Sequence, residues 1–208
     1  SIRGAGNLLG AQQHGFIDSV GFDLYSQMLT EAVQRKQGKN TQTEKTSVEI
    51  DLGIDAYLPT TYIEDERQKI EIYKRIRELE TIDMLDELQD DLMDRFGEYP
   101  DEVAHLLAVG ELKMNGDRAL LERIRKQEQL ITVVLSKVGT KAYTVEQLFK
   151  SLGHTKLKAT LGVEKEQMHL KLTIPNGMKT MVWLHEVQSF VADLRKERYQ
   201  TMKEKTTQ

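Results

Sequence analysis

The sequence has no cysteine, three prolines, one tryptophan and no long hydrophobic run. Without cysteine the chain cannot form disulfides, use a thiol nucleophile or bind zinc through sulfur. No stretch approaches the roughly 18 consecutive apolar residues that a membrane-spanning helix needs. No basic start followed by a short apolar segment indicates a secretory signal. Hydrophobic residues still make up 39% of the 208 residues, enough for a folded core. We therefore expect a cytoplasmic protein with no membrane segment.

The formal net charge of −4 argues against free-standing binding to nucleic acid, but the charge is unevenly distributed. Residues 64–117 hold 7 basic and 17 acidic side chains, a balance of −10. Residues 118–208 hold 17 basic and 9 acidic side chains, a balance of +8. An acidic block followed by a basic one suggests contact with a basic protein surface or internal pairing of the two blocks. Composition does not choose between them.

The first 21 residues hold five glycines with apolar residues between them. Each glycine costs roughly 1 kcal/mol inside a helix, so one long helix is disfavoured. We expect a helical hairpin and loop motif over residues 1–40, incomplete at its N-terminus and packed against another surface. Its second half, 21–35, has apolar residues at spacings of three and four, which predicts an amphipathic helix. Residues 41–46 are polar, as is typical of a linker.

The remainder, 47–208, is predicted to be an α+β domain. Alternation of apolar and acidic residues over 47–59 predicts a strand with one buried face. Beyond it the pattern predicts a helical subdomain, then a small, mainly antiparallel sheet, then a closing helix and a frayed tail at 200–208. The expected helices are about 64–80, 82–97, 101–116, 144–152 and 179–199, and the other strands lie within 124–135, 156–161 and 167–174.

The sequence shows no constellation of catalytic residues. The five histidines are scattered without metal-ligand spacing, and neither a GxxxxGK[ST] phosphate loop nor a GxSxG elbow occurs. We therefore expect no catalytic residue, no metal site and no cofactor within this chain.

One feature that rises above this background is the glycine-rich start, which places Arg3 beside a Gly-x-Gly sequence and Gln13 between further glycines. Planar polar groups on such a backbone can lie across a phosphate or a second loop and change partners as domains move. The alternative is a tight helical hairpin in which glycine only permits close packing.

A second feature is an acidic stripe on the predicted helix 82–97. Its members, at steps of four, three and four, are Glu87, Asp91, Asp94 and Glu98. Side chains at these spacings share one side of a helix. The stripe is either solvated surface or a docking face for arginines of another domain, where paired carboxylates give orientation and specificity.

The chain begins with IRGAGNLLGAQQHG followed by GFDLYSQMLTEAV. This closely resembles the translocation motif shared by the RecG branch-migration helicase and the bacterial transcription-repair coupling factors, of which GFDLY is the coupling-factor version. His14 departs from the serine more usual beside this glutamine. Further along, EIDLGIDAYLP, YKRI at 73–76 and LMDRFG at 92–97 resemble the C-terminal domain of the coupling factors.

The resemblance implies the C-terminal fragment of a superfamily-two, ATP-dependent translocase on double-stranded DNA. Such a factor displaces stalled RNA polymerase and recruits the excision-repair protein UvrA. ATP and magnesium would bind to motor domains upstream of this chain. Arg3 and Gln13 match the arginine and glutamine that link ATP hydrolysis to stepping on DNA.

The resemblance also implies that 47–208 is an autoinhibitory domain, which packs on the factor's own N-terminal domain and masks its UvrA-binding surface. Asp91 and Asp94 match acidic residues of this clamp, and Glu87 and Glu98 are additional candidates. The alternative is a stand-alone nucleic-acid-binding domain that uses the basic residues 118–208. We expect weak or no binding there, because lysine and arginine are interspersed with carboxylates. An enzyme in its own right lacks any supporting residues.

Overall fold

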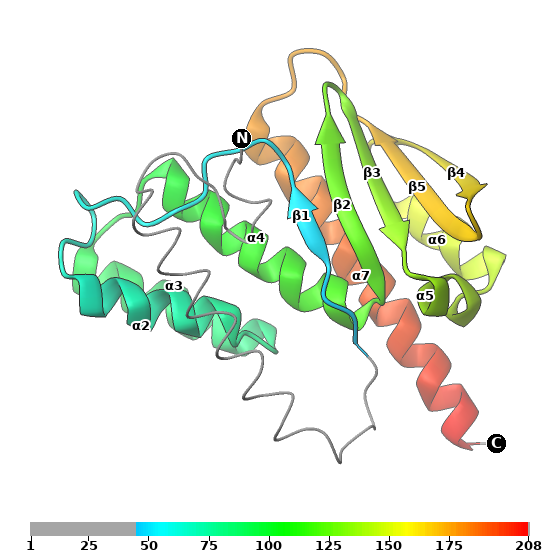
Figure 1. Ribbon diagram of the computed structural model, residues 1–208, viewed down its shortest axis with the longest axis horizontal. Coiled ribbons are helices and arrows are strands. Elements are labelled where there is room, and N and C mark those ends of the chain that lie inside the picture. The colour runs from blue at the N-terminus through cyan, green and yellow to red at the C-terminus, as the bar shows by residue number, and fades with distance from the viewer. Residues whose placement is uncertain (1–44, 208) are drawn as a thin grey trace. The chain divides into compact units, whose positions relative to one another are not determined.

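The computed structural model describes residues 45–207, with the side chains of 45–200. The elements in chain order are β1 (Glu49–Asp51), α2 (Glu66–Arg77), α3 (Ile82–Phe96), α4 (Asp101–Arg118), β2 (Leu121–Gln127), β3 (Leu130–Leu135), α5 (Lys137–Ala142), α6 (Val145–His154), β4 (Lys158–Glu164), β5 (Gln167–Thr173) and α7 (Thr180–Thr207) (Figure 1). The predicted α+β fold is confirmed. The predicted motif of residues 1–40, with Arg3 and Gln13, lies outside the described residues.

The described chain divides into two compact units. We call residues 53–114 the helical unit, and residues 45–52 together with 115–207 the sheet unit. Helix α4 begins in the first unit and ends in the second. The helical unit coincides with the subdomain of three helices that the apolar spacing predicts.

Capping residues set the ends of the first two helices. The carboxylate of Asp65 accepts the backbone N–H of Arg67 at 2.7 Å and so begins α2. The hydroxyl of Thr81 accepts the N–H of Met84 at 3.2 Å and begins α3. Helix α3 ends at Gly97, whose φ of 84° favours glycine. The predicted helix 82–97 thus agrees with α3 to within one residue at its end.

The core of the helical unit consists of apolar side chains from α2, α3 and α4. Its buried members include Ile72, Tyr73, Ile76, Leu79, Leu85, Leu88, Leu92, Val103, Leu106, Leu107, Val109 and Leu112. Close approach of α4 to α2 depends on Gly110, where an added Cβ would lie 2.7 Å from Cγ2 of Ile76. A side chain at this position would therefore force the two helices to shift.

The predicted strand 47–59 is only partly a strand. Every second residue from Val48 to Leu58 is buried, as the alternation predicts. Hydrogen bonding to a neighbouring strand covers only Glu49–Asp51, and Gly53 follows with a φ of 65°. Alternating burial thus continues along an extended segment that has left the sheet.

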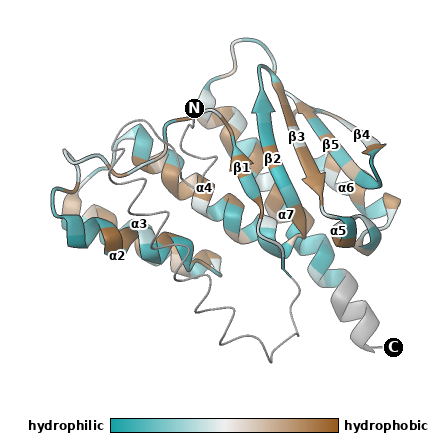
Figure 2. Ribbon diagram, viewed as in Figure 1, coloured by the Kyte–Doolittle hydropathy of each residue, from teal (hydrophilic) through white to brown (hydrophobic). Residues whose placement is uncertain are grey.

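The sheet unit is built on five strands in the order β1-β2-β3-β5-β4. Strand β1 runs parallel to β2, and the other three pairings are antiparallel, as predicted. The central strand β3 is almost wholly apolar (Figure 2), and α6 and α7 lie behind the sheet (Figure 1). The buried side chains of this unit include Ile124, Ile131, Val133, Leu135, Leu170, Leu172, Trp183, Leu184, Val187, Phe190, Val191 and Leu194.

Three local features of the sheet unit differ from the prediction. The strand predicted within 156–161 extends further, as β4 runs to Glu164, so that only Lys165 and Glu166 connect it to β5. Helix α5, capped by Ser136, was not predicted because six residues show no periodicity. Helix α7 continues to Thr207, through most of the expected frayed tail.

Candidate docking surface on α3

Helix α3 carries six acidic side chains and one basic side chain in fifteen residues. Leu85, Leu88 and Leu92, spaced by three and four, are buried and hold the helix on the rest of the helical unit. The acidic residues therefore occupy the remaining surface of the helix.

Four exposed carboxylates lie opposite these leucines, because the helix turns once every 3.6 residues. We call them the acidic row: Asp83, Glu87, Asp90 and Asp94. Their spacing of four, three and four equals that of the predicted stripe, but the row contains different residues. Two predicted members, Glu87 and Asp94, lie in the row.

The other two predicted members lie elsewhere. Glu98 follows Gly97, where α3 has already ended, so it does not continue the helical spacing. Asp91 lies on the flank of α3 that meets α2, and its side chain is only 32% exposed. The expected single stripe of Glu87, Asp91, Asp94 and Glu98 is therefore not the line that the helix presents.

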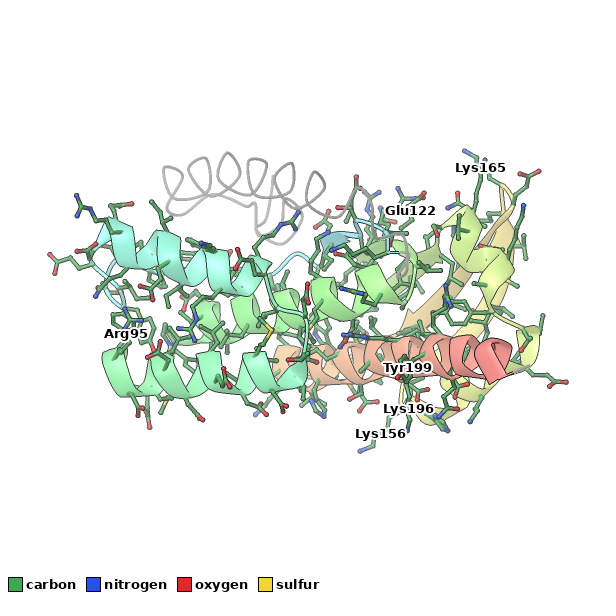
Figure 3. The ribbon with its side chains drawn as sticks, turned by 90° about the horizontal axis from the view of Figure 1, so that it is seen from below. Arg95, Glu122, Lys156, Lys165, Lys196 and Tyr199 are labelled. Carbon is green, nitrogen blue, oxygen red and sulfur yellow. The ribbon has the colours of Figure 1, made fainter. Side chains whose placement is uncertain are left out.

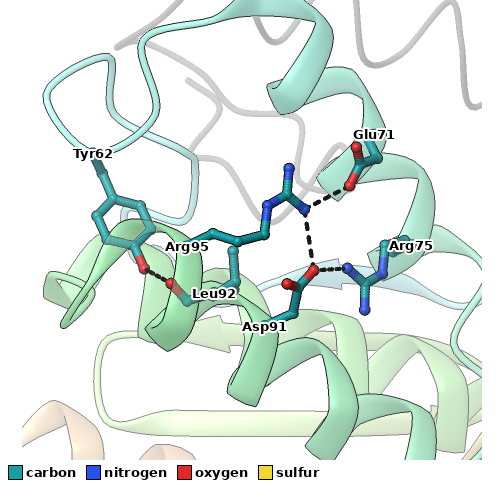
Figure 4. Close-up of polar contacts among 6 residues, drawn as sticks. All are labelled: Tyr62, Glu71, Arg75, Asp91, Leu92 and Arg95. Carbon is teal, nitrogen blue, oxygen red and sulfur yellow. Dashed lines mark hydrogen bonds and ion pairs between the residues drawn. The ribbon is translucent and has the colours of Figure 1, made fainter.

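Asp91 belongs to a network of alternating charges between α2 and α3 (Figure 4). Its Oδ2 accepts hydrogen bonds from Nη1 of Arg75 at 2.5 Å and from Nη1 of Arg95 at 3.1 Å. The same nitrogen of Arg95 donates to Oε1 of Glu71 at 2.8 Å. The sequence analysis did not identify either arginine as a partner of Asp91. The spacing of four residues between Asp91 and Arg95 could have indicated that contact. Arg75 lies on the preceding helix, and no pattern within α3 indicates it.

These contacts shift the pKa values of Asp91 and Arg95. The hydrogen bond from Arg75, followed by that from Arg95, lowers the pKa of Asp91 against an opposing effect of burial. The hydrogen bonds to Glu71 and to Asp91 raise the pKa of Arg95. Both shifts favour the charged forms of Asp91 and Arg95, so the hydrogen bond between them joins two ions.

Aromatic residues fix the end of α3 that carries Asp94. The hydroxyl of Tyr62 lies 2.8 Å from the carbonyl oxygen of Gly97 and 3.2 Å from that of Leu92. The rings of Tyr62 and Phe96 have centroids 5.8 Å apart, and the guanidinium of Arg95 lies 5.0 Å from the Phe96 centroid. The last turn of α3 is thus held against the loop before α2.

A metal site and a membrane-spanning helix were also considered for the described residues. Among residues 45–207, no group of three or more histidine, aspartate and glutamate side chains could hold a metal ion. None of the helices in the same range is long and apolar enough to cross a membrane.

Comparison with known proteins identifies the family. The family model of the TRCF domain matches residues 52–165, slightly more than half of the chain. This chain belongs to the TRCF domain family. The TRCF match includes α2, α3 and α4, and therefore the whole acidic row.

The relatives of this TRCF domain are far longer proteins. The chain is 43% identical over 203 residues to the transcription-repair-coupling factor of Bacillus subtilis (strain 168), covering 97% of this chain and 17% of that protein. It is 48% identical over 177 residues to that of Staphylococcus aureus (strain USA300), covering 85% and 15%. The chain thus spans about one sixth of the curated relatives that it matches.

A solved structure supports the same assignment. The crystal structure of a C-terminal domain of transcription-repair coupling factor is similar to this chain with a TM-score of 0.73 and 38% identity. The similarity covers 77% of this chain and 99% of that one. The chain therefore corresponds to the C-terminal part of a coupling factor that carries the TRCF domain, as the sequence resemblance predicts.

Proposed function

We propose that this chain is the regulatory C-terminal part of a transcription-repair coupling factor, and that α3 docks it on another domain of the same protein. The acidic row carries this proposal, since it places four exposed carboxylates on one side of a helix that is capped and anchored by its leucines. Charges in such a row favour a basic partner surface, giving orientation and specificity more than affinity.

The partner that the resemblance favours is the factor's own N-terminal domain, with α3 covering the surface that binds UvrA. A latch of this kind must open during the working cycle. Exposed ion pairs contribute roughly 0–1 kcal/mol each. A contact made by several of them is accordingly specific yet reversible, which suits autoinhibition.

The activity of the whole factor would come from segments beyond the TRCF domain. We propose an ATP-dependent translocase on double-stranded DNA that displaces stalled RNA polymerase in the cytoplasm. ATP and magnesium would bind to its motor domains rather than to this chain. Arg3 and Gln13 would couple hydrolysis in those domains to movement along DNA.

Charge reversal in the full-length factor tests the docking role. With Asp91→Lys and Asp94→Lys combined, we expect immobilised factor to capture more UvrA than the wild type does. The matched control is Glu128→Lys with Glu146→Lys, which makes the same change in net charge at exposed positions of the sheet unit. Capture equal to that of wild type would refute the docking assignment.

The alternative, nucleic-acid binding through 118–208, finds less support. On β2 the two arginines Arg123 and Arg125 face Glu49 and Asp51 of the neighbouring β1 in the sheet register. These acidic neighbours interrupt the positive charge. Measuring the affinity of this chain for duplex DNA at increasing salt concentration separates the two functions. Affinity that falls steeply with salt would indicate phosphate contacts and would support the nucleic-acid-binding alternative.

A further inference from the structure

The outer edge of the five-stranded sheet carries an interaction surface that the docking of α3 does not use. Strand β4 is the last in the order β1-β2-β3-β5-β4, and in the described part of the chain no strand pairs with its other side (Figure 1). An exposed strand edge presents backbone N–H and C=O groups to which another strand can bond. We propose that β4 pairs, antiparallel, with β4 of a second copy of this chain.

The first step is the direction of the backbone groups of β4. The two-residue turn 165–166 joins Glu164 to Gln167, and these two residues pair directly beside it. In such a hairpin the pair beside the turn exchanges both hydrogen bonds, and the exchange then alternates along the ladder. Every second residue of β4, counted back from Glu164, therefore bonds to β5. The residues between them direct their N–H and C=O groups to the outer edge: Ala159, Leu161 and Val163.

The second step is the register. A two-fold axis at Leu161 gives every residue of Lys158–Glu164 a partner in the second copy. It places Lys158 of each copy opposite Glu164 of the other, and both side chains are exposed. It also pairs the residues that direct their backbone groups outward, Ala159 with Val163 and Leu161 with its own copy. Parallel pairing of the same residues would instead place like charges opposite each other, which destabilises a sheet.

The third step is the apolar face of the hairpin. Ala159 and Leu161 pair with Leu172 and Leu170 of β5, whose side chains are fully buried. Val163 continues this face and is 62% exposed. In the dimer it lies beside Ala159 of the second copy, so that apolar surface is removed from water.

The fourth step is the charged face. Oε2 of Glu164 lies 3.2 Å from Nε2 of His169, and its Oε1 lies 4.0 Å from Nζ of Lys171. Both neighbours belong to β5, and the side chain of Glu164 is still 60% exposed. The carboxylate is thus accessible to Lys158 of the second copy. Because it already has two basic neighbours, the new charge pair contributes more to the choice of register than to affinity.

Sedimentation equilibrium of the 208-residue chain at low salt tests the proposal. One strand pair is a small interface, so we expect dimers at roughly 0.1 mM and monomers at about 1 μM. Lys158→Glu and Glu164→Lys should each weaken dimerisation about five- to fiftyfold, since each reverses two charge pairs. An equimolar mixture of these two variants should dimerise like wild type, because every end pair of the mixed dimer again joins opposite charges.

A backbone variant tests the hydrogen bonds of the edge. Val163→Pro removes an outward N–H while leaving the ladder to β5 intact, and should weaken dimerisation about tenfold. Val163→Ala is its control, because it shortens the side chain and keeps the N–H. If Val163→Pro does not fold, the charge variants decide, since they leave the backbone unchanged.

The charge controls are Lys179→Glu and Glu128→Lys, which lie at exposed positions outside β4 and should leave dimerisation unchanged. A chain that stays monomeric at about 1 mM would refute the proposal. Association that survives both charge variants and Val163→Pro would also refute it, since it would use another surface. So would a mixture of the two charge variants that stays monomeric.

Discussion

Nη1 of Arg75 donates a hydrogen bond to Oδ2 of Asp91 at 2.5 Å and joins α2 to α3 across 16 positions of sequence. Asp91 lies beside the outward line of acidic residues on its own helix, on the flank that meets α2. The contact makes one carboxylate of an acidic helix part of a network of alternating charges. The surface that α3 offers to a partner is therefore set as much by α2 as by α3.

Acid should destabilise the helical unit through Asp91. Its pKa in the folded protein is lowered from 3.8, first by the hydrogen bond from Arg75. A lowered folded pKa gives stability that is present above the unfolded pKa of about 4 and is lost as the pH falls through the folded value. In urea unfolding, Asp91→Asn should therefore cost stability at pH 7, and its difference from wild type should shrink as the pH falls below about 4. A pH-independent difference would contradict this account, and Asp86→Asn serves as the control.

The packing at Gly110 predicts opposite results for two glycine-to-alanine changes in helices. In Gly110→Ala the new methyl group meets Ile76 Cγ2 at 2.7 Å inside the core. Such overpacking costs about 1–3 kcal/mol and outweighs the gain of about 1 kcal/mol in helix propensity. Gly153 in α6 has no atom within 4 Å of an added Cβ. Gly153→Ala should thus stabilise the protein by about 0.4–1 kcal/mol. Thermal unfolding of the two variants should show melting temperatures shifted in opposite directions.

The β4–β5 hairpin carries backbone strain at its tip. Lys165 and Glu166 have φ values of 51° and 66°, the left-handed region that Asn-Gly adopts with least strain. Lys165 projects at this tip, away from the strands (Figure 3). We expect Lys165→Asn with Glu166→Gly to raise the free energy of unfolding by about 1–2 kcal/mol. The control is Glu146→Gly in α6, which should lower it by about 1 kcal/mol. Lower stability of the hairpin variant would contradict the assignment of strain.

A buried hydroxyl stabilises the sheet unit. The Tyr143 oxygen lies 2.6 Å from the carbonyl oxygen of Ala119 and 3.2 Å from that of Leu194. Tyr143→Phe leaves a buried carbonyl without its donor and should cost about 1–3 kcal/mol in urea unfolding at pH 7.

The same hydroxyl should respond to alkali. Burial raises the pKa of Tyr143 above its ordinary 10.0. Because the folded pKa is raised, this contribution is fully present below pH 10 and declines as the pH rises toward the folded value. Wild type should therefore lose stability above pH 10 more steeply than Tyr143→Phe does. Parallel pH curves for the two proteins would show that the hydroxyl does not titrate in this way.

The sequence was sufficient to predict local structure wherever that structure depends on contacts between residues close in sequence. Thr81 and Gly97 set the ends of α3 through contacts within four residues, and the leucine spacing shows which face is buried. The strand predicted over 47–59 was too long, because its length depends on a neighbouring strand that is distant in sequence. Alternation reports burial on one face, whereas a strand also needs a neighbour to bond, and β2 accompanies it only at Glu49–Asp51.

The candidate docking surface was likewise determined partly by the sequence and partly by the tertiary structure. The acidic character of α3 follows from the sequence, because six carboxylates in fifteen residues must occupy whatever surface the leucines leave. Which carboxylates lie opposite the leucines also follows from the helical period. That Asp91 pairs with Arg75 was decided by the packing of α2 against α3. That packing depends on contacts between residues distant in sequence, and no pattern within one helix records them.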